Sequence, residues 1–315
     1  MLVLLGTKPV NFPNHKLVSK MKNFLKKIKP SWLAASLIGV LLLILLFEYV
    51  IISANKNNLA KKNAKIIESL LLENFEQSER ILIFVGRKIA AEAPTLNLNA
   101  INKIFNQVSA IHGANSLFSW SMFDFVDRNG YQTLNTAHGI RPIPLNVSDR
   151  HYNTGRGADH WTLLFSPPLV GNSSDSYVIP IGVQIEVKND SRAGAVVLGI
   201  VIRKLINLIE SRVDRNIEFA LIDKKSKKFT IGSQDAEKNF KDCSYEEIFL
   251  RNPNLFAAVE MSERYPYQIL VKYNKKQFWL EVIGKSLIAW LQVIGLAIAV
   301  LILQKAFLEK KSRSR

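Results

Sequence analysis

The sequence of 315 residues contains a single cysteine, Cys243, so an intrachain disulfide is excluded. Small secreted domains that depend on disulfides are therefore excluded as a class. The residues around the thiol, KDCSYEE, contain nothing that would activate it. We expect Cys243 to be a buried small residue rather than a nucleophile.

Catalytic and nucleotide-binding signatures are also missing. The sequence has no nucleophile elbow and no kinase signature, and the GRG at 155–157 lacks the spacing of a phosphate-binding loop. The possible metal ligands of the same region are Asp149, His151, Asp159 and His160. Their spacing fits no common zinc module. We therefore expect no enzyme, no cofactor and no metal site.

Charged residues are absent from two long apolar segments, SWLAASLIGVLLLILLF (31–47) and SLIAWLQVIGLAIAVLILQ (286–304). Each approaches the roughly 20 residues that a helix needs to cross the hydrocarbon core of a bilayer. We expect transmembrane helices at 32–54 and 284–304, with Glu48 at the outer interface. The first apolar run exceeds the roughly 7 to 15 residues of a cleaved signal peptide, which predicts an uncleaved anchor.

Acidic residues are missing from residues 1–31, which carry seven lysines, and residues 305–315 carry five Lys or Arg against one Glu. Basic residues gather on the cytoplasmic side of membrane spans, so both tails are expected in the cytoplasm. The whole sequence has a net charge of +16, but the segment from 55 to 285 has 30 basic and 24 acidic residues. The charge therefore predicts a lipid bilayer as partner, and no nucleic acid.

The chain between the spans begins with helical patterns and continues with strands. Apolar residues at helical spacing predict one long helix from 55 to 92 and a second from 99 to 111. Around Asn129-Gly130, alternation predicts a β-hairpin. YVIPIGVQIEV (177–187) and AGAVVLGIVI (193–202) are predicted to be adjacent antiparallel strands, followed by a helix over 203–213.

A second, smaller group of elements follows. It is predicted to contain a strand at 217–223, a helix at 245–251, and strands in LFAAVEMS (255–262) and YPYQILVKY (265–273). From 274 the chain is helical and continues into the second span. We expect a larger lobe at 55–213 and a smaller lobe at 214–280.

Four short motifs in order carry a resemblance to a known family: SDRHY (148–152), SPPLVG (166–171), YVIPIGVQI (177–185) and RAGAVVLGIVI (192–202). This order between two spans resembles the Cache or PDC (PAS-like) extracytoplasmic sensor domains of bacterial receptors, in their double form. The resemblance implies an α+β fold with a long N-terminal helix, a membrane-distal antiparallel-sheet lobe and a smaller membrane-proximal sheet lobe. It also implies a periplasmic domain anchored in the inner membrane.

The resemblance further implies a ligand pocket in the membrane-distal lobe. Arg150 would donate two parallel hydrogen bonds to a carboxylate, and Tyr152 would form a wall of the pocket. Further candidate ligand contacts are Trp120, Ser166 and Tyr177. Each candidate has a structural alternative: Arg150 would pair with Asp149 or Asp127, the aromatic residues would pack in the core, and Ser166 would cap or turn the chain.

The ligand class follows from two departures from the family pattern. Relatives that bind free amino acids carry an R-x-W-Y run, and an aspartate follows their S-x-P segment. Here Asn153 replaces the last aromatic residue, and Gly171 stands where the acid would align. A mono- or dicarboxylate is therefore favoured over an amino acid.

The apolar stripe of the long helix predicts a homodimer through residues 55–92; alternatively, the stripe covers the domain's own sheet. Eleven residues follow the second span, which is too few for a signalling module. We therefore expect a separate cytoplasmic partner, such as a histidine kinase. The alternative is a non-sensing membrane scaffold or the remnant of a truncated receptor.

Overall fold

The structure is a computed structural model, and it describes residues 30–93, 95–112, 119–154, 161–171, 176–187, 190–233, 256–261 and 263–313. The chain divides into two compact units: Ser53–Gln277 forms one, and the segments before and after it form the other. The helix predicted at 245–251, Cys243, Asp159 and His160 lie outside the described residues.

Helix α2 spans Pro30–Glu92 without a break. The helix predicted from 55 to 92 is confirmed, and it is continuous with the first apolar segment. It ends two residues before Pro94, which has no backbone N–H to continue the hydrogen-bond ladder. Helix α3, Leu98–His112, follows as predicted.

Seven strands form the large sheet in the described part of the chain, in the order β3-β2-β1-β7-β6-β4, with β5 also paired to β6. The strands are β1 (Trp120–Asp127), β2 (Tyr131–Asn135), β3 (Gly139–Asn146), β4 (Leu164–Phe165), β5 (Leu169–Val170), β6 (Tyr177–Val187) and β7 (Asp190–Val201). Every pair is antiparallel. The predicted β1–β2 hairpin is confirmed, and Gly130 in its turn has φ +83°.

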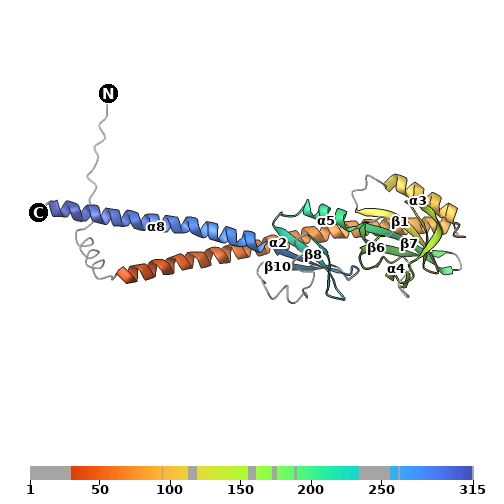
Figure 1. Cartoon of the computed structure of the whole chain (residues 1–315), viewed down its shortest axis with the longest axis horizontal. Coiled ribbons are helices and arrows are strands. Elements are labelled where there is room, and N and C mark those ends of the chain that lie inside the picture. The colour runs from red at the N-terminus through yellow and green to blue at the C-terminus, as the bar shows by residue number, and fades with distance from the viewer. Residues whose placement is uncertain are drawn as a thin grey trace, which may run out of the picture. The chain divides into compact units, whose positions relative to one another are not determined.

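The large sheet is covered on both faces. Helix α3 and the short helix α4 (His151–Thr154) lie on opposite sides of it (Figure 1). Phe123 of β1 stacks on Phe105 of α3, with ring centres 5.9 Å apart. Side chains alternate along a strand, so Ile179 and Ile181 point to the face of the sheet that α3 covers, while Val178 and Pro180 point to the face that α4 covers. All four are buried.

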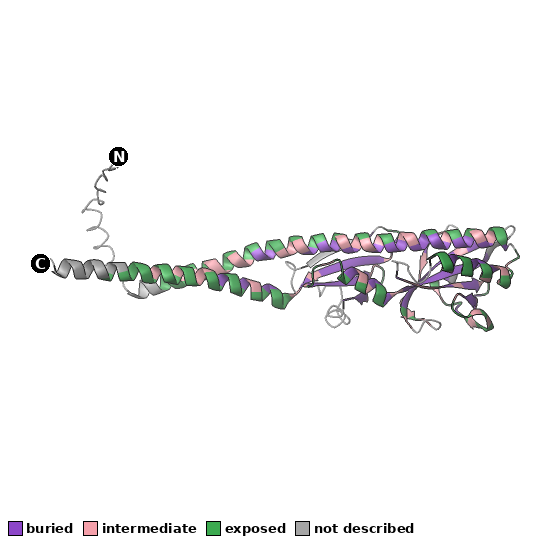
Figure 2. Cartoon of the chain, turned by 90° about the horizontal axis from the view of Figure 1, so that it is seen from above, coloured by how far each residue is buried: buried purple, intermediate pink, exposed green. Residues whose placement is uncertain are grey.

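Helix α2 buries one face against the strands of its own domain (Figure 2). The buried residues recur every three or four positions: Ala60, Ala64, Ile67, Leu71, Phe75, Ser78, Leu82, Val85 and Ile89. Burying each large apolar side chain contributes about 1.5–3 kcal/mol. These residues are therefore not available to a second copy, and the alternative that the stripe covers the domain's own sheet holds. A dimer through α2 would have to use its outer face.

A small sheet follows helix α5 (Ile202–Glu210). In the described residues it has four strands in the order β10-β11-β8-β9. They are β8 (Ile217–Asp223), β9 (Phe229–Gly232), β10 (Phe256–Glu260) and β11 (Tyr267–Tyr273). The predictions of β8, β10 and β11 are confirmed, whereas β9 was not predicted.

The other unit contains the first part of α2 and most of helix α8, Lys275–Arg313. Two helices are long and apolar enough to cross a membrane, in Ala35–Glu92 and Lys275–Ile302, and only 6% of the most apolar window of each is buried. Within this unit the indole N–H of Trp290 donates to the carbonyl oxygen of Leu41 at 3.0 Å. The ring of Tyr49 lies 5.6 Å from that of Phe278.

Candidate functional site

The cavity that contains two of the five predicted ligand residues lies on the α4 face of the large sheet; we call it the α4 cavity. Its volume is about 60 Å³. It is lined by Ser121, Met122, Asp124, Gln132, Leu145, Val147, Arg150, Tyr152, Leu169, Gly171, Val178, Pro180, Val197 and Gly199. A single water needs about 10–15 Å³ of such volume, so the cavity has room for about five waters or one compact solute.

Helix α4 is held over the sheet by local hydrogen bonds. Asn146 accepts bonds from the backbone N–H of Ser148 at 3.0 Å and from its hydroxyl at 2.8 Å, which turns the chain after β3. The backbone N–H of His151 then donates to the hydroxyl oxygen of Ser166 at 3.1 Å. Ser166 itself is anchored to β6, because its N–H donates to the carbonyl of Pro180 at 2.9 Å.

Tyr152 is a residue of α4, and its side chain packs against the large sheet. Only 6% of the residue is exposed, and it packs with Val126, Val147 and Val197. Gly182 of β6 allows this close approach, since a Cβ there would lie 3.0 Å from the Cβ of Tyr152. Burial raises the pKa of the Tyr152 hydroxyl, and the negative charge of Asp124 raises it further. Tyr152 therefore acts as a neutral wall with one hydroxyl.

Arg150 lies at the start of α4 and lines the cavity. Its Nε is 3.5 Å from a carboxylate oxygen of Asp149, whose side chain is 76% exposed. Exposed ion pairs of this kind contribute about 0–1 kcal/mol. The alternative partner Asp127 instead accepts the backbone N–H groups of Asn129 and Tyr131, at 2.9 Å each. The Asp149 pair therefore contributes little to stability, and Arg150 remains a lining residue of the α4 cavity.

Asp124 is a lining residue that the sequence analysis missed. The side-chain N–H of Gln132 donates to its carboxylate at 2.6 Å. Burial raises the pKa of the Asp124 carboxyl to about 7, although the Gln132 hydrogen bond and the positive charge of Arg141 both lower it. The signal in the sequence was an acid inside the apolar strand FDFVD, where an unpaired charge is costly.

The structure does not bring the other three predicted residues to the cavity lining. The indole of Trp120 donates to the hydroxyl of Ser78 on α2 at 2.7 Å, which lies on the opposite face of the large sheet. Ser166 is 2% exposed, and its hydroxyl accepts the backbone N–H of His151 in α4. Tyr177, at the first position of β6, is 50% exposed. Within the described residues, no three possible metal ligands lie together.

An aromatic cluster joins the large sheet to the small sheet; we call it the aromatic joint. Phe165 of β4 contacts the rings of Phe75 on α2, Tyr265 and Tyr267, with centres 5.1, 6.0 and 5.8 Å apart. Beside this cluster, Arg264 forms an ion pair with Glu79 of α2. Glu79 is 5% exposed. Phe165 precedes Ser166, so the joint is one residue away from the anchor of α4.

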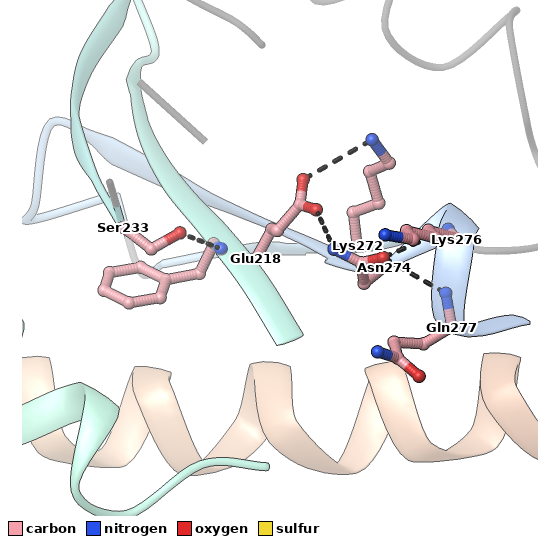
Figure 3. A network of polar contacts seen from close by, with 7 residues as sticks. Glu218, Ser233, Lys272, Asn274, Lys276 and Gln277 are labelled. Carbon is pink, nitrogen blue, oxygen red and sulfur yellow. Dashed lines mark hydrogen bonds and ion pairs between the residues drawn. The ribbon is translucent and has the colours of Figure 1, made fainter. Parts of the chain in front are cut away.

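A polar network fixes the first turn of α8 (Figure 3). The side-chain oxygen of Asn274 accepts the backbone N–H groups of Lys276 at 3.0 Å and Gln277 at 3.2 Å, which makes Asn274 the N-cap of this helix. Its side-chain N–H donates to the carboxylate of Glu218 at 3.0 Å. Glu218 is 6% exposed and also pairs with Lys272 at 3.4 Å.

The same network reaches α2 through the loop before β8. The backbone N–H of Asn274 donates to the carbonyl of Asn216 at 2.8 Å, and the N–H of Asp214 donates to the side-chain oxygen of Asn63 at 3.1 Å. Asn63 lies on α2 and is 3% exposed. We call Asn63, Asp214, Asn216 and Asn274 the helix clamp. It connects α2 to the N-cap of α8 within the domain.

No family model and no curated protein matches the sequence. Solved structures do match. The ligand-binding domain of the Campylobacter jejuni chemoreceptor Tlp3 in complex with L-valine is 12% identical with a TM-score of 0.53, and the match covers 74% of this chain and 98% of that chain. The ligand-binding domain of the Pseudomonas fluorescens chemoreceptor CtaA in complex with L-leucine is 14% identical with a TM-score of 0.53, over 71% and 97%.

A third match is the extracellular domain of a protein assigned as a histidine kinase, rpHK1S-Z16, which is 15% identical with a TM-score of 0.52, over 68% and 93%. At such low identity the likeness concerns the fold. It agrees with the resemblance that the motifs predicted. The chain therefore has the α+β fold of the extracellular Cache/PDC-type sensor domains of chemoreceptors and histidine kinases.

Proposed function

We propose that this protein is a membrane-anchored sensor whose domain at 53–277 binds a small solute in the α4 cavity. The observation that carries the proposal is a cavity lined by Arg150, in a fold similar to that of ligand-binding domains of chemoreceptors. An arginine in a partly buried site binds a carboxylate through two parallel hydrogen bonds. The ligand would therefore carry a carboxylate group and be small enough for about 60 Å³.

The two apolar helices support a membrane location. In water, the exposed leucine, isoleucine and valine side chains of α2 and α8 would form a large apolar surface, which soluble proteins avoid. Lipid would cover that surface at no such cost. With the basic tails in the cytoplasm, the domain would lie in the periplasm of a bacterial inner membrane.

Signal transmission would use the aromatic joint and the helix clamp. A ligand that moves α4 would act on Ser166 and, through Phe165, on the rings of Phe75 and Tyr265. The clamp would then couple a displacement of α2 to the first turn of α8. A ligand shifts this equilibrium only by binding one arrangement better than the other. The receiver would be a separate cytoplasmic protein such as a histidine kinase, and a homodimer would use the outer face of α2.

The test is a thermal-shift screen of the full chain in detergent against small carboxylates. A ligand that binds the folded state alone stabilises it by about 2.7 kcal/mol at a hundred times its Kd. Arg150→Gln should abolish the shift. Arg203→Gln is a matched control, because Arg203 is an exposed arginine on α5. If Arg150→Gln keeps the full shift, the cavity assignment is wrong.

A membrane scaffold is the second candidate. It is favoured by the burial of Tyr152, which is 6% exposed and packs with Val126, Val147 and Val197. A scaffold predicts that no small solute raises the melting temperature. It also predicts that Arg150→Gln affects neither stability nor partner binding.

A further inference from the structure

We propose that the end of the domain that leads into the two spans binds the phosphate groups of anionic lipids. Three lysines carry this site, Lys56 on α2 and Lys275 and Lys276 on α8; we call them the basic patch. The inference rests on the proposed membrane location and adds a lipid partner of defined charge. It concerns a different part of the domain from the α4 cavity.

Lysines are concentrated beside both apolar segments, on the side that carries the domain. Residues 49–67 contain four lysines and no acid, and residues 269–280 contain three lysines and no acid. Basic residues are normally enriched at the cytoplasmic ends of membrane spans. With both tails in the cytoplasm, topology does not account for these lysines. A negatively charged lipid surface attracts basic residues next to a span, and would account for them.

Two lysines of the basic patch occupy an electrostatically unfavourable place. Lys275 and Lys276 are exposed in the first turn of α8, which contains no acid. The first turn of a helix carries partial positive charge, so a cation there is destabilising. Asn274 already accepts the backbone N–H groups of Lys276 and Gln277 (Figure 3). An anion would therefore be bound by the two ammonium groups rather than by the helix end, and it would offset their charge.

The nearby acids are paired with other lysines. Glu218 pairs with Lys272 at 3.4 Å, and Glu281, the first acid of α8, pairs with Lys285 at 3.2 Å. In the described part of the chain, no carboxylate forms an ion pair with either of the two lysines in the first turn of α8. Their counter-charge would therefore come from outside the domain.

Lys56 brings α2 into the basic patch. Its Nζ lies 4.5 Å from the ring centre of Tyr273, which is 3% exposed and directly precedes Asn274. This cation–π contact places the lysine beside the segment that leads into α8. A lipid bound to the patch would thus contact both helices next to the helix clamp.

Aromatic residues place the basic patch at the depth of the lipid phosphates. Tyr and Trp are enriched at the level of the headgroups, and the ring of Tyr49 lies 5.8 Å from that of Trp279. Trp279 follows Lys276 by three residues, about 5 Å along the helix, and Lys56 follows Tyr49 by seven residues, about 10 Å. Long lysine side chains extend along such a surface, so all three reach this level.

Native mass spectrometry of the full chain in detergent tests the inference by titration with phosphatidylglycerol, which is anionic, or phosphatidylcholine, which is zwitterionic. Wild type should prefer phosphatidylglycerol. A lysine near an anionic lipid surface contributes about fivefold in affinity, so Lys275→Gln combined with Lys276→Gln should reduce the preference by about 25-fold.

The matched control removes the same charge from the other end of the small sheet. Lys225→Gln combined with Lys228→Gln changes two exposed lysines in the turn after β8. Seven residues of β8 separate this turn from the clamp, about 23 Å at 3.3 Å per residue. The control should keep the wild-type preference.

Two results would overturn the inference while the membrane location stands. One is equal binding of the two lipids by wild type, a measurement that needs no variant to fold. The other is displacement of phosphatidylglycerol by an equal concentration of inorganic phosphate, which would assign the patch to a free anion. A full chain that stays in solution without detergent would overturn the membrane location and the inference together.

Discussion

Replacing Asp124 with Asn should stabilise the domain at pH 8 and leave its stability unchanged near pH 4. Asp124 has a pKa of about 7 in the folded protein and the ordinary value of 3.8 in the unfolded chain. Ionisation is therefore harder in the folded state. The cause is burial, which outweighs both the hydrogen bond from Gln132 and the charge of Arg141.

The sign of the pH dependence follows directly. Below pH 3.8 the carboxyl is protonated in both states and costs nothing. Between pH 4 and 7 the unfolded chain has lost the proton that the folded chain keeps, so the free energy of unfolding decreases as pH rises. Above pH 7 the penalty is complete and constant. Asparagine does not titrate, so it avoids the penalty at every pH.

The magnitude comes from the size of the shift. Each pKa unit corresponds to about 1.4 kcal/mol, so a shift from 3.8 to about 7 sets a limit of about 4 kcal/mol. Asp124 is partly exposed, and screening by solvent reduces the effect to about 2–4 kcal/mol. For a domain of this length 1 kcal/mol corresponds to about 2–4 °C, so Asp124→Asn should raise Tm by about 4–16 °C at pH 8.

The assay is differential scanning fluorimetry of the full chain without ligand, at pH 4.5, 6 and 8. Wild type and Asp124→Asn should differ least at pH 4.5, by about 1 kcal/mol, and separate further as the pH rises to 8. Glu210→Gln, at an exposed acid on α5, should follow wild type throughout. An Asp124→Asn protein that melts below wild type at pH 8 would refute the reasoning, because it would show that the ionised carboxylate stabilises the fold.

Two further predictions concern the supports of the cavity and the clamp. Gly130→Ala should lower the free energy of unfolding by about 1–3 kcal/mol and weaken ligand binding, because φ is +83° and a Cβ would lie 2.6 Å from the Cα of Ser148 in the turn before Arg150. Denaturant unfolding measures the first effect and ligand titration the second. An unchanged free energy of unfolding would contradict the prediction. Asn274→Ala should remove the N-cap of α8 and cost about 1 kcal/mol. It should leave ligand affinity intact but reduce signalling in a reporter strain, whereas full signalling would show that the clamp is not the coupling element.

Much of the architecture could be predicted from the sequence, because its strongest patterns are local. The helix at 55–92 has no proline and a clear apolar stripe, and β6 and β7 are long runs of branched residues. The strands that were not predicted lack the usual sequence pattern of a strand. Strand β3 carries Pro142 and Pro144, which are tolerated because it lies at the edge of the sheet, and β4 and β5 have two residues each.

The candidate site was harder to predict, because it depends on which face of the sheet each residue occupies. Arg150 and Tyr152 were found through a motif, and the fold brings both to one cavity. Trp120 is separated from them by the sheet, since a register shift in β1 between Trp120 and Phe123 sets its direction toward α2. Asp124 is 26 residues before Arg150 in the sequence, and only strand pairing brings the two together.

The energetic position of Asp124 also bears on the choice between a sensor and a scaffold. A scaffold needs only stability, and an asparagine at position 124 would preserve the bond to Gln132 without the cost of a buried charge. A receptor needs a site whose polar groups are satisfied by the ligand rather than by the protein, because that difference drives binding and any accompanying motion. An acid that weakens the empty domain and faces the same cavity as an arginine meets this requirement. The structure therefore favours ligand recognition over a purely architectural role for the α4 cavity.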